Sequence, residues 1–210
     1  MRQTPSRAVW SNGKRLKGMD AGTRVGIRHW WLILLSAALH RIPFAVFGPQ
    51  EMVDLKRTAM VASYLLLLLA FVCNLNLKSI RVMLAGTAMN FTAILANGGL
   101  MPVSPEIRHL AAFNPLGPEW IGRVLPDGSG ILLPAHQTNL LLLTDVIPAA
   151  RLGGAYSAGD VLIIAGFFLL ITEVFLAYRD TRRKSPAQDG ERENRRTPEF
   201  GTDANASPVS

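Results

Sequence analysis

The chain has 210 residues and a net charge of +7, with 49% hydrophobic and 18% charged residues. So low a charged fraction, collected mainly at the two ends of the chain, excludes an ordinary water-soluble domain. The single cysteine excludes an internal disulfide and a cysteine-based zinc or redox centre. Because the basic residues flank apolar segments and no nucleic-acid motif occurs, we expect contact with anionic lipid headgroups and no nucleic-acid partner.

The N-terminal segment, residues 1–28, holds seven Lys or Arg residues against one acid and shows no apolar periodicity. We predict a basic cytoplasmic tail here rather than a signal peptide. The first membrane span is predicted over residues 30–48, opened by the interfacial aromatics Trp30 and Trp31. Arg41 interrupts it, so either the helix ends there or the Arg41 side chain reaches back to the far headgroups.

The second span, residues 59–77, contains nineteen residues without one charge. At 1.5 Å per residue, such a helix covers about 30 Å, the thickness of a bilayer's hydrocarbon core. The third span is predicted over residues 82–97, and the fifteen residues before Asn97 rise only about 22 Å before a glycine stop. We therefore expect the chain to leave helical geometry at membrane depth, where protein or water must cover it.

A Gly/Pro-rich connector, residues 98–158, follows the third span. Its apolar patch Thr138–Ile147 is too short to cross a bilayer and predicts an interfacial or re-entrant helix. The last span is predicted over residues 159–178, with Ser157 and Asp160 as a capping box at its start. Residues 179–210 mix charged, Pro and Ser residues and predict a disordered charged tail.

These elements predict an all-α integral membrane protein with about four transmembrane helices plus a re-entrant or interfacial helix. The membrane domain is residues 29–178. Each tail carries seven Lys or Arg residues, whereas the connector 98–158 carries three. By the positive-inside rule, both termini are expected in the cytoplasm and the connector outside a plasma membrane.

Polar residues inside or beside the apolar segments are the candidates for chemistry. Asn90 and Asn97 are seven residues apart and share one helix face, which predicts either helix packing or the lining of a polar cavity. Asp145 lies among apolar residues and either binds a cation or proton or faces the headgroups. Asp160 either coordinates a ligand or caps the last helix. Glu173 either reaches the cytoplasmic headgroups or pairs with a basic residue such as Arg81.

No catalytic pattern accompanies these residues in the sequence. The four histidines lack the spacing of three or four residues that a helical metal pair needs, and no serine stands in a nucleophile motif. We therefore expect no enzyme activity, no metal and no cofactor.

Three motifs carry a resemblance to a known family: Asn97-Gly98-Gly99-Leu100-Met101-Pro102, Asp145-Val146-Ile147-Pro148 and Tyr156-Ser157-Ala158-Gly159-Asp160. In this order they resemble an actinobacterial-type family of multi-pass membrane proteins, domain of unknown function 5317. The resemblance covers about residues 12–178 and implies a bacterial membrane protein, but no activity. Family members usually have Phe where Tyr156 stands. They also often have an apolar helix before a basic turn that Asn12–Leu16 matches, so here that helix is either absent or hidden by a misassigned start.

The sequence thus predicts a multi-pass membrane protein of unknown activity, non-enzymatic, whose motif segments fold against each other on the outer side as paired re-entrant elements. The alternative is a carrier or channel for a small solute or ion, with Asn90, Asn97 and Asp145 as ligands. The candidate functional motif comprises Asn90, Asn97, Gly98, Gly99, Met101, Pro102, Asp145, Pro148, Gly159 and Asp160.

Overall fold

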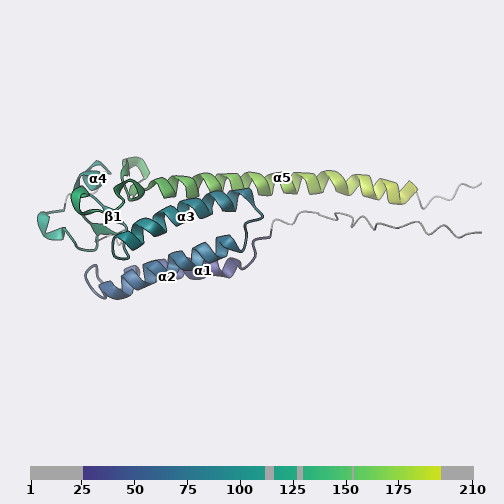
Figure 1. Ribbon diagram of the computed structural model, residues 1–210. Coiled ribbons are helices and arrows are strands. Elements are labelled where there is room, and N and C mark those ends of the chain that lie inside the picture. The colour runs from purple at the N-terminus through teal and green to yellow at the C-terminus, as the bar shows by residue number, and fades with distance from the viewer. Residues whose placement is uncertain (1–25, 112–115, 127–129, 153, 195–210) are drawn as a thin grey trace, which may run out of the picture. The chain divides into compact units, whose positions relative to one another are not determined.

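The computed structural model describes residues 26–111, 116–126, 130–152 and 154–194, and Val25–Tyr178 form one compact unit. The predicted tail at residues 1–25 lies outside these ranges, as do residues 195–210. Four helices dominate the unit (Figure 1): α1 (Trp30–Val46), α2 (Val53–Val72), α3 (Lys78–Ala96) and α5 (Ala158–Asn194). The helices α2, α3 and the Ala158–Arg179 part of α5 are long and apolar enough to cross a membrane, whereas α1 is apolar but shorter.

The third helix corrects the prediction made for it. It begins at Lys78 rather than at residue 82, so it contains 19 residues and rises about 28 Å. The expectation of a span too short for a bilayer is therefore wrong. The extra turn forms because the N-terminus of α3 receives a partner from α5, described below, that local sequence does not reveal.

The helices α1 and α2 pack against each other as an antiparallel pair. The Ser36 hydroxyl of α1 donates to the Ser63 carbonyl of α2 at 2.8 Å, so a buried polar group is satisfied between the helices. Beyond the end of α2, the Asn74 side chain exchanges two hydrogen bonds with the backbone of Arg28, at 2.7 and 2.8 Å. These contacts fix the start of α1 beside the end of α2.

The connector is folded and contains short strands and turns. Its elements are β1 (Pro102–Val103), α4 (Pro105–Leu110), η1 (Pro118–Trp120), β2 (Ile131–Leu132), η2 (Ala135–Gln137), η3 (Leu141–Leu143), β3 (Ile147–Ala149), η4 (Ala150–Leu152) and β4 (Gly154–Tyr156). Strands β1 and β2 pair in parallel, with Pro102 opposite Ile131, and β3 and β4 pair antiparallel, with Pro148 opposite Ala155. The fold is therefore mostly helical rather than all-α.

The helix predicted over Thr138–Ile147 does not form. Leu140 adopts a left-handed backbone conformation with φ 51°, and only the single 3₁₀ turn η3 follows it. The next residues extend instead, because the Asp145 N–H donates to the Pro102 carbonyl at 3.4 Å, beside β1. A backbone committed to a neighbouring strand cannot also make the hydrogen bonds of a helix.

Two apolar clusters hold the connector onto the helices. The first joins Met60 of α2 and Ile94 of α3 to Leu100, Met101 and Ile131 of the connector, all of them buried. The second lies within the connector and centres on Val103, Leu125 and Leu132. The core therefore sits where α2 and α3 meet the connector.

The last helix extends beyond its predicted end. Residues 179–194 continue α5, where the sequence indicated disorder from residue 179 onward. Half of these sixteen residues are Arg, Lys, Glu or Gln, which have high intrinsic helix propensity and extend a helix that is already nucleated. The helix continues through Pro186 and Gly190 despite their low propensity.

Candidate functional site

A buried polar site joins α3 to the start of α5. The Asn90 amide donates to Asp160 Oδ1 at 2.7 Å, and the Ser157 hydroxyl lies 2.7 Å from Asn90 Oδ1. Asn90 and Ser157 are fully buried. We call Asn90, Ser157 and Asp160 the α3–α5 cluster.

Asp160 also caps its own helix, as the sequence predicted. Its Oδ2 accepts the Ser157 N–H at 2.9 Å, while the Ser157 hydroxyl accepts the Asp160 N–H at 3.0 Å. This reciprocal pair is a capping box, which satisfies two backbone donors at the first turn of α5. Because the second carboxylate oxygen is bound by Asn90, both oxygens of Asp160 are occupied within the protein.

Asp145 lies near this cluster, so the structure brings together two acids that are separate in the sequence. Burial, together with the smaller effect of the negative charge of Asp160, raises the pKa of the Asp145 carboxyl group from 3.8 to about 8. Tyr64 of α2 is close enough to interact electrostatically with both acids. This Asp145 group can therefore gain or lose a proton near neutral pH.

Gly159 and Gly86 allow the close approach of the two helices. A Cβ atom on Gly159 would overlap the side chain of Asn90 and the carbonyl of Gly86, and one on Gly86 would overlap the carbonyl of Gly159. Small residues at facing positions let helix backbones pack closely, and this packing aligns Asn90 with Asp160. Gly159 thus contributes to the site because a side chain at this position would prevent the contact between Asn90 and Asp160.

The Asn97-Gly98-Gly99 motif lies apart from the α3–α5 cluster and ends α3. Gly98 and Gly99 have φ of 75° and 92°, and their N–H groups donate to the carbonyls of Leu95 and Ile94. This is a Schellman motif, which confirms the predicted glycine stop. The Asn97 side chain exchanges two hydrogen bonds of 2.9 Å with the backbone of Asn139, so the motif also anchors the 138–143 segment.

The remaining motif residues occupy structural positions. Met101 is buried in the first core cluster, and Pro102 is buried in β1. Pro148 is exposed in the middle of β3. The two motif segments do contact each other, through Val103 and Asp145, but by strand pairing rather than as paired helices.

Glu173 does not pair with the Arg81 side chain, which was one of the two alternatives predicted for it. Its carboxylate accepts the Ser79 hydroxyl at 2.6 Å and the Lys78 N–H at 3.1 Å, so it caps the N-terminus of α3 from across the helix pair. A carboxylate is favourable there because the first N–H groups of a helix lack partners and carry positive partial charge. Arg81, the expected partner, instead donates to the Leu75 carbonyl at 2.8 Å.

Sequence reasoning counted Lys56 only as a small counter-signal to the predicted orientation and did not predict its buried role. Its side chain is only 1% exposed, and its ammonium group donates to the carbonyls of Phe47, Gly48 and Pro49. It also lies 5.6 Å from the centre of the Phe44 ring. Lys56 therefore binds the turn between α1 and α2, and its only sequence signal was a charge placed four residues into a helix that follows a Gly-Pro turn.

The fold and the site together define a mostly helical protein, whose described residues include three helices long and apolar enough to span a membrane and a folded connector at one end of the bundle. The chain belongs to the family of unknown function DUF5317, whose model matches residues 24–172. That range includes the three motifs that carried the resemblance, and the predicted membership of this family is confirmed. No curated protein and no solved structure matched the chain.

Proposed function

We propose that the protein is a non-enzymatic, multi-pass protein of a bacterial plasma membrane, with α1, α2, α3 and α5 in the bilayer. The observation that carries this is the surface of α5, where Phe167, Phe168 and Phe175 are 52, 64 and 62% exposed. Each such side chain left in water forgoes about 1.5–3 kcal/mol of burial free energy. Lipid hydrocarbon removes that cost, since the apolar surface is then covered.

The charge distribution supports an orientation for this membrane protein. Arg28, Lys78 and Arg81 lie at one end of the helix bundle, which the Asn74–Arg28 and Glu173–Lys78 contacts bring together. The folded connector joins the other end. The positive-inside rule then favours a cytoplasmic location for both termini and an external location for the connector. In this arrangement the basic tails contact anionic headgroups.

A non-enzymatic role is supported by the contacts within the α3–α5 cluster. Both Asp160 oxygens and both polar atoms of the Asn90 amide are engaged in helix capping and helix contact. Buried polar groups that satisfy one another rigidify a bundle and are not free to act as a base or a nucleophile. We infer that the cluster holds α5 against α3 and thereby positions the connector.

Membrane insertion and orientation are tested by cysteine labelling. In a Cys73→Ala background, Glu119→Cys places a thiol on the exposed part of η1 and Asn76→Cys places one in the exposed turn between α2 and α3. A membrane-impermeant maleimide should label position 119 in intact cells and position 76 only after lysis. The reverse pattern would refute the orientation, and recovery of the protein in the soluble fraction after alkaline extraction would refute membrane insertion.

A second candidate function is the transport of a proton or small cation. The observation in its favour concerns Asp145, which lies near Asp160. The pKa of the Asp145 carboxyl group is about 8, so this group exchanges a proton under physiological conditions. The flux of protons or cations into proteoliposomes should then be lower with the Asp145→Asn variant than with the wild type. Equal flux in the two proteins would contradict transport through this residue. Asn97, which the sequence suggested as a second ligand, is instead engaged by the backbone of Asn139.

A further inference from the structure

An open groove runs between α2 and the end of α3 and has no role in the cluster described above. Its volume is about 500 Å³, and its lining consists of Arg57, Thr58, Val61, Ala62, Leu65, Leu95, Gly98 and Gly99. This volume is within the range of roughly 300–1,000 Å³ that small-molecule sites have. The groove is therefore large enough for part of an amphiphile.

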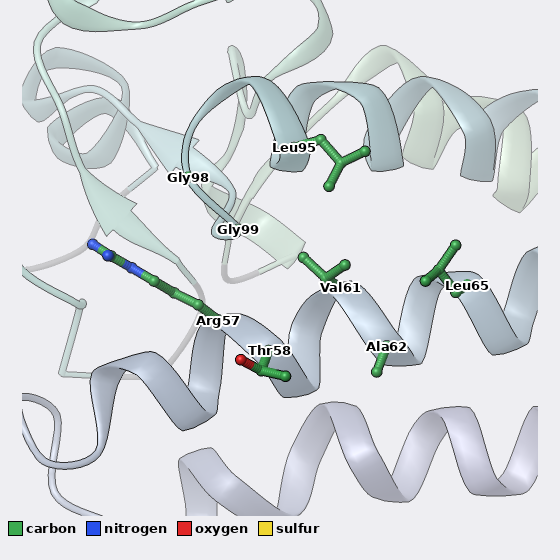
Figure 2. A pocket seen from close by; sticks show the side chains of 8 residues that line it. All are labelled: Arg57, Thr58, Val61, Ala62, Leu65, Leu95, Gly98 and Gly99. Atoms are coloured by element: carbon green, nitrogen blue, oxygen red, sulfur yellow. The ribbon is translucent and has the colours of Figure 1, made fainter.

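The groove is apolar along its length and cationic at one end. Figure 2 shows Val61 and Leu65 of α2 and Leu95 of α3 beside the space between the helices, with the Arg57 side chain extending away from Leu65. Leu65 and Leu95 are each 51% exposed, so the apolar part opens to the surroundings of the bundle. An apolar slot that ends at a positive charge matches an acyl chain attached to an anionic headgroup.

The guanidinium of Arg57 is weakly engaged by the described residues. Its one ion pair joins Nη1 to Asp54 Oδ1 across 3.8 Å, and the Asp54 side chain is 99% exposed. The buried Arg57 Nε has no hydrogen-bond partner. Exposed pairs of this length contribute little, so the donors of Arg57 can turn to a phosphate oxygen at small cost.

The position of Arg57 along α2 sets its depth in a bilayer. It stands two residues before Ala59, where the uncharged segment of α2 begins. If that segment spans the hydrocarbon core, the guanidinium lies at headgroup level and the groove descends from it toward Leu65. Gly98 and Gly99 keep this end of the groove open, because neither carries a side chain.

We propose that this groove binds one anionic phospholipid, with its phosphate at Arg57 and one acyl chain along Val61, Leu65 and Leu95. The inference rests on the proposed membrane location. It adds a specific lipid site at the connector end of the bundle, separate from the general attraction of the basic tails. Arginine supplies the selectivity because it forms paired, charge-assisted hydrogen bonds with phosphate, which a zwitterionic headgroup partly neutralises.

The test is native mass spectrometry of the full-length protein released from detergent, titrated with phosphatidylglycerol or phosphatidylcholine. We expect a single phosphatidylglycerol adduct at concentrations where phosphatidylcholine gives little. The Arg57→Gln variant loses one charge-assisted contact, so its affinity for phosphatidylglycerol should be about tenfold or more below that of the wild type. The matched control, Arg123→Gln, removes the same charge from an exposed connector position and should bind like the wild type.

A second variant tests the apolar part of the groove. Leu95→Trp enlarges an exposed lining residue, so it should fold and should block the acyl chain while leaving Arg57 in place. If Arg57→Gln does not fold, Arg57→Lys, which keeps the charge but not the paired donors, replaces it and should bind phosphatidylglycerol more weakly than the wild type.

Three results would overturn the proposal. They are equal binding of the two lipids, unchanged binding in both Arg57→Gln and Leu95→Trp, and displacement of the lipid by inorganic phosphate or glycerol phosphate at the concentration of the lipid itself. A dimer that forms through the groove and excludes lipid would also overturn it, and the same spectra would show its mass. These outcomes differ from failure of the proposed membrane location, which the extraction experiment measures independently.

Discussion

Replacing Lys56 with Met should destabilise the protein strongly, although the substitution removes a charge from an apolar environment. The Lys56 ammonium donates to three carbonyls of the α1–α2 turn, of which the bond to Gly48 is short and those to Phe47 and Pro49 measure 3.4 and 3.2 Å. Methionine fills a similar volume but leaves all three acceptors without this donor.

The expected magnitude follows from these contacts. Removing the partner of a buried polar group costs about 1–3 kcal/mol, and more where a charge is involved. Two of the three bonds are long, and relief of the ammonium desolvation offsets part of the loss. We therefore expect a net destabilisation of about 2–4 kcal/mol, which corresponds to a fall in melting temperature of about 4–16 °C for a domain of this size.

Thermal unfolding in detergent, followed by circular dichroism at 222 nm, measures this effect. The neighbouring Arg57→Gln variant is the control, because Arg57 is half-exposed and its one ion pair with a described residue is the 3.8 Å contact with Asp54. Its free energy of unfolding should stay within about 0.5 kcal/mol of that of the wild type in the absence of added anionic lipid. Equal stability of Lys56→Met and Arg57→Gln would refute the argument that the buried ammonium holds the turn.

Three further predictions concern the α3–α5 pair and its surroundings. Because the folded state raises the pKa of Asp145 from 3.8 to about 8, it binds a proton more tightly than the unfolded state. The stability from this group is therefore complete below pH 4, falls by up to about 1.4 kcal/mol per pH unit in between, and is lost as pH rises through 8. Asp145→Asn should flatten this profile in melting curves recorded from pH 4 to 9, and an unchanged profile would contradict the assignment. Glu173→Leu should lower stability by about 1–2 kcal/mol in urea titrations through loss of the α3 cap, with Glu173→Gln retaining part of it; equal stability of Glu173→Leu and wild type would argue against capping. Gly159→Leu should separate α3 from α5 and expose Asn90 to hydrogen exchange, whereas Gly98→Ala, where a Cβ meets no atom, should cost only about 1 kcal/mol for its left-handed backbone; equal exchange in these two variants would contradict the close approach.

Sequence reasoning recovered the features that depend on neighbours along the chain. The apolar length of α2, the glycine stop after Asn97 and the Ser157–Asp160 capping box each involve residues within a few positions of one another, so their signals are local. Reasoning from apolar length failed at the start of α3, because the residues 78–81 contain Lys78 and Arg81 and look like a loop by composition.

The sequence by itself determined the apolar segments, the glycine stop of α3, the capping box of α5 and the family, because hydrophobic length and turn chemistry act over short stretches of chain. Only the tertiary structure decided which polar groups meet. Asn90 finds Asp160 across 70 residues, Lys78 finds Glu173 across 95, and Lys56 is buried by a turn that folds back over it. A side chain's partner and its exposure depend on helix packing and on the path of the connector. Many packings satisfy the same apolar pattern, so pattern alone cannot select among them.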